Sequence, residues 1–195
     1  MSKTHGPFTA IALCAGLVAV NPNAVDAQPR GAEPRAEVFV SVGSTGLSRF
    51  EDRGFGRHSD VGAGAALLIT HGLALQIEAQ HVYGLKPGPS GCEVNAPCGA
   101  TAASASGRLQ FGTSRVQGYV LGGIVILRTE TRAFSTGVEA RTIDTGVGPL
   151  IGGGVKVGIV RGLFVQPSVW AGTTVWMSHV NLSTSRASLA AGYRW

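Results

Sequence analysis

Hydrophobic and polar residues alternate along most of the chain with a period of two positions. In residues 73–83, aliphatic side chains occupy one register, and the other register carries mainly glutamine and glutamate. A period of two places successive side chains on opposite faces of a β-strand. We find no segment of useful length with the period of a helix after residue 35. Eight segments are therefore predicted to be strands: 36–45, 60–70, 73–83, 101–112, 115–128, 145–160, 163–176 and 184–195.

The connections between these segments alternate strictly between short and long. Tight turns fall at 70–73, 112–115 and 160–163, and longer joins fall at 46–59, 84–100, 129–144 and 177–183. A Greek-key sandwich has no reason to follow such a rule. An up-and-down barrel in an outer membrane does follow it, because its periplasmic turns are short and its outer loops are long. The sequence therefore predicts an all-β, eight-stranded antiparallel up-and-down transmembrane β-barrel.

The polar face of the predicted strands carries few charges. Those charges stand among many glycine, alanine and serine residues, whereas a solvent-facing sheet normally carries many more lysines and glutamates. Sparse charges of both signs suit the crowded lumen of a small barrel. We expect a lumen charge network of Glu78, Arg108, Lys156 and Arg194, in which Glu78 pairs with Arg108 on the neighbouring strand.

Strand length and closure support the same fold. Each predicted strand has ten or more residues, and a membrane-spanning strand needs about 9 to 11. Lipid offers no hydrogen-bond partner to the backbone, so every strand edge must be paired within the sheet. Closure of the sheet therefore pairs 36–45 with 184–195. Two strands fit less well: 115–128 is apolar on both faces, and 163–176 turns Trp170 and Trp176 toward the lumen. Pro149 and Pro167 each remove a ladder donor, which predicts a bulge or an edge position.

The N-terminal residues predict export. Lys3 precedes thirteen apolar residues at 8–20, and small residues at 25 and 27 mark a cleavage site. Thirteen residues are too few for a membrane-spanning helix. The sequence thus divides into a helical signal peptide at 1–27, a short periplasmic lead at 28–35 and a single barrel domain at 36–195.

Composition limits the kinds of partner and binding site that the sequence predicts. Charged residues make up 14% of the chain, below the roughly 25% of soluble domains, and the net charge of +5 is too dispersed to predict a nucleic-acid partner. Cys92 and Cys98 remain after removal of the signal peptide, and an even count in an exported chain predicts a disulfide in the second outer loop. The dispersed histidines predict no metal site, and no cofactor is expected.

The sequence resembles the small outer-membrane barrels of the OmpA/OmpX type across residues 36–195. The segments that carry the resemblance are GYVLGG at 118–123, GGGVKV at 152–157, LFVQP at 163–167 and the aromatic pair Tyr193 and Trp195. The resemblance implies that Tyr193 and Trp195 form the C-terminal signal read by the barrel-assembly machinery. It also implies an outer-membrane location with periplasmic termini, in contact with outer-membrane lipid and lipopolysaccharide.

We expect a structural or surface-interaction role without catalysis. A small pore, a lipid A-modifying enzyme and a soluble lipocalin-like barrel remain alternatives. A lipid A deacylase of this type resembles His-x-Ser-Asn, whereas this chain has His179-x-Asn181, so catalysis by His179 with Ser178 or Ser183 is not expected. Arginines of the predicted outer loops suit bidentate binding of lipopolysaccharide phosphates: Arg49, Arg53, Arg57, Arg128, Arg132 and Arg141.

Overall fold

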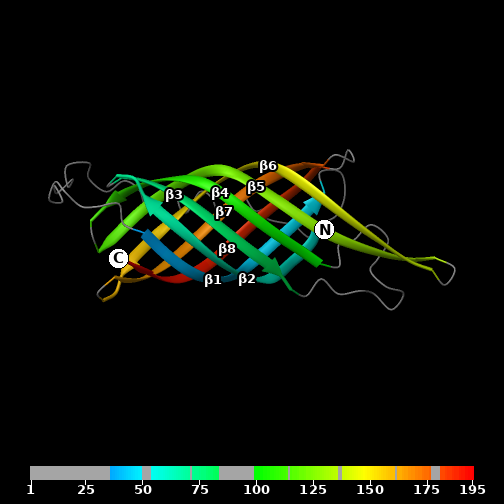
Figure 1. Cartoon of the computed structure of the whole chain (residues 1–195), viewed down its shortest axis with the longest axis horizontal. Coiled ribbons are helices and arrows are strands. Elements are labelled where there is room, and N and C mark those ends of the chain that lie inside the picture. The colour runs from blue at the N-terminus through cyan, green and yellow to red at the C-terminus, as the bar shows by residue number, and fades with distance from the viewer. Residues whose placement is uncertain are drawn as a thin grey trace, which may run out of the picture.

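The structure is a closed antiparallel barrel of eight strands that follow one another in chain order (Figure 1). The computed structural model describes residues 36–49, 54–70, 72–83, 99–113, 115–135, 138–160, 162–176 and 181–195. The strands are β1 (Ala36–Arg49), β2 (Gly54–Leu68), β3 (Leu73–Val82), β4 (Gly99–Gly112), β5 (Val116–Ser135), β6 (Val138–Gly158), β7 (Leu163–Trp176) and β8 (Asn181–Arg194). The predicted signal peptide, the lead at 28–35, Cys92 and Cys98 lie outside the described residues.

Pairing of the first and last strands closes the barrel. β1 and β8 run antiparallel from Glu37 opposite Arg194 to Arg49 opposite Leu182. Each strand therefore has a hydrogen-bonded neighbour on both sides, which confirms the predicted all-β, up-and-down barrel. No helix in the described ranges is long and apolar enough to cross a membrane.

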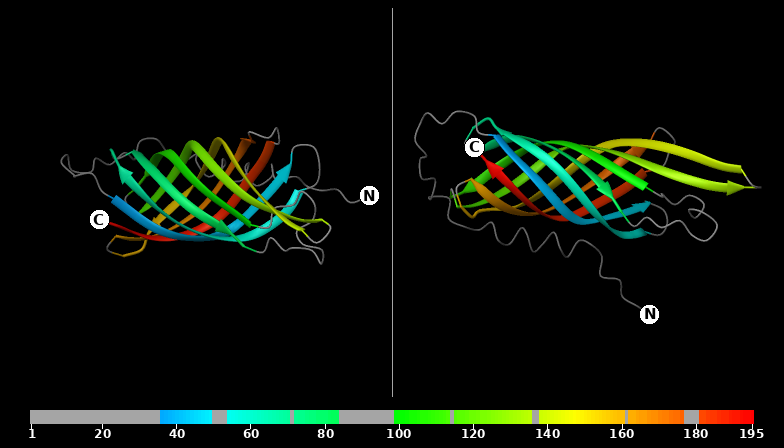
Figure 2. Two further views of the ribbon diagram at one scale, coloured as in Figure 1. Left: turned by 45° about the vertical axis from the view of Figure 1, so that its right-hand side comes forward. Right: turned by 60° about the horizontal axis from the view of Figure 1, so that its bottom comes forward.

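The two ends of the barrel differ. The β2–β3, β4–β5 and β6–β7 connections are short and lie at the end where β1 begins and β8 ends, which we call the turn end (Figure 2). Gly162 in the β6–β7 connection has a φ of 89°, a left-handed conformation that favours glycine. At the opposite end, β5 and β6 project beyond the other strands as a two-stranded hairpin, so we call it the hairpin end (Figure 1).

The predicted long joins at 46–59 and 129–144 are wrong over most of their length. β1 continues to Arg49, β2 starts at Gly54, and β5 and β6 remain paired up to Ser135 opposite Val138. The sequence interpretation ended these strands where the apolar alternation ended. Backbone hydrogen bonds of an antiparallel ladder do not require apolar side chains, so pairing continues into the polar residues.

Apolar and polar side chains divide between the two faces of the barrel as predicted. Large aliphatic residues are exposed on the outside, for example Val40 at 63% and Ile77 at 62%. Buried residues on the inside include glutamines, serines, threonines and three basic residues. The predicted registers of 73–83, 101–112, 145–160 and 184–195 agree with this division. A soluble barrel has the reverse arrangement, with its apolar face inward.

The irregular segments have structural explanations. β5 is apolar on both faces because Leu121, Val125 and Leu127 fill the lumen while Ile124 and Ile126 face outward. Trp170 lies in the lumen as predicted, in the same apolar cluster, whereas the side chain of Trp176 is not among those described.

The two prolines interrupt the β6–β7 ladder without shifting it. No pairs form across Pro149 or Pro167, yet the register is the same on both sides of each interruption, from Val147 opposite Val175 to Val157 opposite Val165. The missing N–H group of proline accounts for the lost pairing. The predicted bulge is therefore not needed at either position.

Candidate functional site in the barrel lumen

Opposite charges inside the barrel come from different strands. The lumenal acids that form ion pairs in the described ranges lie on β1, β2 and β3, at Glu37, Asp60 and Glu78. The lumenal bases lie on β4, β6 and β8: Arg108, Lys156, Arg186 and Arg194. Most of their ion pairs therefore cross the lumen between strands that are not neighbours, as in the pairs of Glu37 with Arg108 and Lys156.

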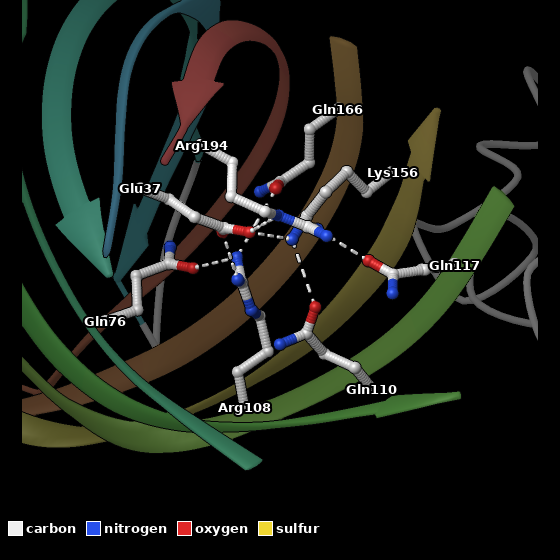
Figure 3. Close-up of polar contacts among 8 residues, drawn as sticks. All are labelled: Glu37, Gln76, Arg108, Gln110, Gln117, Lys156, Gln166 and Arg194. Atoms are coloured by element: carbon white, nitrogen blue, oxygen red, sulfur yellow. Dashed lines mark hydrogen bonds and ion pairs between the residues drawn. The ribbon is translucent and has the colours of Figure 1, made fainter. Parts of the chain in front are cut away.

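The first of two clusters is centred on Glu37, which is fully buried near the turn end (Figure 3). One Glu37 oxygen, Oε1, accepts from Lys156 Nζ at 2.5 Å and from Arg194 Nε at 2.8 Å. The other oxygen, Oε2, accepts from Arg108. Three cations thus share one carboxylate. The Glu37 cluster consists of these four residues and the four glutamines that contact them: Gln76, Gln110, Gln117 and Gln166.

Each of the four glutamines turns its side-chain oxygen toward a cation (Figure 3). The oxygens of Gln76 and Gln166 accept from Arg108 at 3.0 and 3.4 Å. Gln110 accepts from Lys156 at 3.0 Å, and Gln117 accepts from Arg194 at 2.7 Å. Amide oxygens replace part of the hydration that the buried cations lose, because each contributes a charge-assisted hydrogen bond.

The second cluster is centred on Arg186, which is buried midway along the barrel. Its guanidinium donates to Asp60 Oδ1 from Nε at 2.8 Å and to Glu78 Oε1 from Nη1 at 2.6 Å. Ser41 Oγ accepts from Arg186 at 2.9 Å and donates to Glu78 at 2.9 Å. Thr45 Oγ1 donates to Asp60 at 2.8 Å. These five residues form the Arg186 cluster, in which two carboxylates share one cation.

The expected pairing of Glu78 with Arg108 is wrong. Glu78 lies opposite Ser104, and Arg108 lies opposite Ala74, so the two side chains occupy different levels of the β3–β4 ladder. Glu78 pairs instead with Arg186 and Arg108 with Glu37. The four predicted network residues all carry ion pairs, but they belong to two separate clusters.

Three charged members were not predicted as part of the network: Glu37, Asp60 and Arg186. Arg186 stands in the lumenal register of its strand, as the alternation in 184–195 already indicates. Glu37 and Asp60 stand at the starts of the predicted strands 36–45 and 60–70, where an alternation pattern has too few residues to assign a face.

Apolar side chains fill the lumen toward the hairpin end. Leu47, Val82, Leu127 and Leu182 are buried there together with Ala100 and Ala102. Toward the turn end, Phe39 and Phe164 pack with Ala190, and the ring of Phe39 lies where a side chain on Gly64 would stand. On β1, Phe39 stands between Glu37 of the first cluster and Ser41 of the second, so apolar side chains occupy the lumen between the clusters as well as toward the hairpin end.

The predicted loop arginines lie mostly in strands, which corrects their assignment to loops. Arg49 ends β1, and Arg57 and Arg128 are exposed on β2 and β5. Arg132 and Arg141 lie directly opposite one another in the β5–β6 hairpin. Arg53 lies outside the described residues. The physical reason is again the continuation of the ladder beyond the apolar segments.

Polar side chains border the exposed apolar belt at the hairpin end. His81, Thr101, Arg128 and Thr145 follow one another across β3 to β6 as successive ladder partners. His81 Nδ1 lies 3.3 Å from Thr101 Oγ1, and its ring meets Tyr83 edge-on with centroids 4.7 Å apart. We call these four residues and Tyr83 the polar border.

The aromatic pair at the turn end is exposed. The rings of Tyr193 and Trp195 stack with centroids 6.3 Å apart, and the backbone N–H of Trp195 donates to the backbone carbonyl of Ala36 at 3.2 Å. Both rings face outward, next to the apolar belt. Aromatic rings of this kind are favoured where lipid meets water.

The described residues contain no group of three or more His, Cys, Asp and Glu side chains placed to hold a metal ion. Of the residues considered for lipid A chemistry, Ser178 and His179 lie outside the described ranges. Ser183 lies in β8 opposite Thr173 and Ser48.

No protein-family model matches the chain, and no curated protein matches it. Several solved structures are similar to the chain. Neisserial surface protein A superposes with a TM-score of 0.62 at 13% identity, covering 83% of this chain and 99% of that one. Ail, the attachment invasion locus protein of Yersinia pestis, gives 0.58 at 12% identity, covering 84% and 100%.

The N-terminal β-barrel domain of Pseudomonas aeruginosa OprF gives a TM-score of 0.52 at 14% identity, with 84% of this chain and 100% of that domain covered. These proteins are similar to this chain over nearly their whole lengths. Identities this low establish the backbone architecture only. The chain therefore has the fold of the small eight-stranded outer-membrane barrels.

Proposed function

We propose that this chain is an integral outer-membrane β-barrel protein of a diderm bacterium with a structural or surface-interaction role and no catalytic role. The observation that carries the proposal is the distribution of its side chains. The outside carries a belt of exposed aliphatic residues, while the charges are buried inside. Lipid is the surrounding that suits both faces, because it accepts the aliphatic belt and because every strand of the closed barrel has a hydrogen-bonded neighbour on both sides.

The difference between the two ends of the barrel supports one orientation of the protein in the membrane. Short turns and the aromatic pair Tyr193 and Trp195 lie at one end, and the long β5–β6 hairpin lies at the other. Outer-membrane barrels have short periplasmic turns and longer outer connections. The turn end, with the start of β1 and the end of β8, therefore belongs in the periplasm, and the hairpin projects from the cell surface.

Two isoleucines on the outer face of β6 test the membrane assignment. Ile151 is 72% exposed within the apolar belt, and Ile143 is 43% exposed beyond the polar border, opposite Glu130. Replacing Ile151 by Arg places a charge in lipid and costs about 2–4 kcal/mol, whereas Ile143→Arg stays in water and changes little. The free energy of unfolding by urea, measured in phospholipid vesicles, distinguishes them.

Equal unfolding free energies for the two arginine variants contradict a membrane-embedded belt. The same conclusion follows if sodium carbonate extracts the wild-type protein from membranes. Either result favours the soluble lipocalin-like barrel instead.

The filled lumen supports a structural role rather than transport. Ion pairs span the lumen at two levels, and apolar side chains fill it toward the hairpin end. Barrels of eight strands have an interior that is just wide enough for side chains to fill or for one small ligand. Planar-bilayer recordings are therefore expected to show no steady conductance steps above the lipid baseline. Reproducible steps would favour the small pore.

Two exposed arginines near the hairpin end support lipopolysaccharide as a partner. Arg57 and Arg128 are exposed on the outside near the hairpin end, where phosphorylated headgroups of the outer leaflet lie. Ail, one of the similar structures, has been solved in complex with the heparin analogue sucrose octasulfate, a polyanion, at a TM-score of 0.55. Bidentate hydrogen bonds from arginine suit such anionic groups.

A double variant tests this contact. Arg57→Ser with Arg128→Ser should lower the affinity of the vesicle-embedded protein for lipopolysaccharide about tenfold or more, since each charge-assisted hydrogen bond contributes about 1.5–3 kcal/mol when fully formed. Arg115→Ser is the matched control, because Arg115 is exposed at the turn end. Equal affinities for the double variant and the control contradict the proposed contact.

We also infer that Tyr193 and Trp195 serve as the assembly signal. Both aromatic rings are exposed at the end of the last strand and are accessible to another protein before insertion. Trp195→Ala should lower the yield of folded protein in the outer membrane several-fold, while Phe111→Ala, which removes another exposed aromatic ring at the turn end, should not. Heat-modifiable gel migration measures the folded fraction. Equal yields contradict a signal role.

A further inference from the structure

The Glu37 cluster carries more positive charge than its own residues balance. Arg108, Lys156 and Arg194 meet the single carboxylate of Glu37, which leaves two positive charges in excess among the described residues. Arg108 and Lys156 are at most 2% exposed. Burying charge without a counter-charge is unfavourable in a low-dielectric interior, so this excess favours a bound anion.

Buried donors without partners lie in the same place. The Nε–H of Arg108 and the amide nitrogen of Gln110 form no hydrogen bond, and both side chains are more than nine-tenths buried. They project from β4 two residues apart and therefore on the same face. Tyr119 lies directly opposite Gln110 in the β4–β5 ladder.

The orientation of Gln110 is fixed by its neighbour. Its oxygen accepts from Lys156 at 3.0 Å, so its amide nitrogen points away from Lys156, on the side of the Arg108 side chain (Figure 3). A reversed amide would set a donor against the ammonium group. The Arg108 guanidinium in turn lies over the Tyr119 ring, 5.4 Å from its centroid. The two unpartnered groups thus lie on the same face of β4, and both are hydrogen-bond donors.

The Arg186 cluster does not combine unpartnered donors with an excess of positive charge. It also lies near unpartnered buried groups, the amide nitrogen of Gln80 and the hydroxyl of Thr184. Its charge balance is the reverse, however, because Asp60 and Glu78 face one guanidinium. An anion there would meet two carboxylates. Only the Glu37 cluster combines free donors with excess positive charge.

We propose that the Glu37 cluster binds a small inorganic anion, held by Arg108 Nε and Gln110 Nε2 beside Lys156 and Tyr119. A single halide or a compact oxyanion such as phosphate matches both the donors and the charge. The site lies near the turn end, and the partly exposed Arg194 marks the side from which an ion enters. The anion completes the electrostatic balance of the lumen. This inference does not depend on the membrane or surface role proposed above.

The test is anion-dependent stability at constant ionic strength. Wild-type protein in detergent micelles is unfolded with urea while chloride replaces gluconate, an anion too large for a packed lumen. Phosphate replaces gluconate in a parallel series. Binding to the folded state alone raises the folded-to-unfolded ratio about tenfold for each tenfold rise in anion concentration above its dissociation constant. The more effective series identifies halide or oxyanion. No change in either series overturns the proposal.

The same substitution at two buried glutamines, one inside the Glu37 cluster and one outside it, separates site binding from a general salt effect. Gln110→Glu supplies a carboxylate beside Lys156 and Arg108, so the urea midpoint should become independent of the anion and should not fall in gluconate. Gln80→Glu, in a similarly buried glutamine of β3, is the matched control and should keep the anion response. A response that survives in Gln110→Glu overturns the proposal.

Diffraction provides a measurement that does not depend on the variants. Crystals of the wild-type protein grown in bromide should show an anomalous peak within hydrogen-bonding distance of Arg108 Nε and Gln110 Nε2. Absence of the peak at full bromide concentration overturns halide binding. Crystals grown in phosphate then test the oxyanion, which should give difference density at the same position. Absence of both ions overturns the site.

Discussion

The two ion-pair clusters of the lumen both balance buried charges around one central residue, but the central charges have opposite signs. In the Glu37 cluster, one carboxylate gathers three cations, and glutamine oxygens supply the remaining acceptors. In the Arg186 cluster, one guanidinium gathers two carboxylates, and Ser41 and Thr45 supply hydroxyl groups. Glutamine oxygens can only accept, which suits cations, whereas hydroxyl groups can donate to carboxylates.

The difference shows how neutral neighbours follow the sign of the buried charge. Around Glu37 the cations outnumber the acid, and the four glutamines all present oxygen atoms. Around Arg186 the acids outnumber the base, and the neutral partners donate through hydroxyl hydrogens. In both clusters, a single central residue satisfies groups from several strands. The centre is therefore the most sensitive position of each cluster.

The largest effect is expected from removing either centre. Glu37→Gln leaves three lumenal cations without their carboxylate, and Arg186→Gln leaves two lumenal carboxylates without their cation. Breaking a buried ion pair by removing one partner costs about 3–5 kcal/mol. The free energy of unfolding by urea in detergent micelles measures both losses. A loss below about 1 kcal/mol in either variant contradicts the central role of that residue.

A smaller effect is expected from removing one neutral partner in each cluster. Gln76→Leu removes an acceptor of Arg108, and Thr45→Val removes a donor to Asp60. A hydrogen bond to a charged group contributes about 1.5–3 kcal/mol. The same urea titration is expected to give similar losses for the two variants. A large difference would mean that one cluster readily replaces the lost partner with water.

The smallest effect is expected from removing a surplus charge. Arg194→Gln leaves Glu37 with two cations, and Glu78→Gln leaves Arg186 with Asp60 alone. Each change relieves part of the charge imbalance, so the lost attraction is offset by a smaller desolvation cost, and the net change stays within about 1 kcal/mol. If either variant unfolds as easily as the variants of the central residues, the distinction between central and surplus charges fails.

The sequence predicted which residues face outward, but it did not predict which charged residues pair in the lumen. Alternation identified Leu75 and Ile77 as outward residues and Gln76 and Glu78 as lumenal ones, because the period of two is a local property of a strand. The same local reasoning placed Glu78 next to Arg108. It failed because a side chain in a narrow barrel reaches across the lumen as easily as it reaches along the sheet.

The sequence by itself determined the number of strands, their order, the face of most residues and the closure of β1 on β8, since each follows from local periodicity and from the need to pair every edge. Only the tertiary structure decided which charges meet. The tilt and stagger of a closed barrel bring Glu37 of β1 to Arg108 of β4 and Lys156 of β6, a convergence that no spacing in the chain encodes. The tertiary structure also decided the length of the β5–β6 hairpin, because ladder hydrogen bonds continue wherever two strands stay in register.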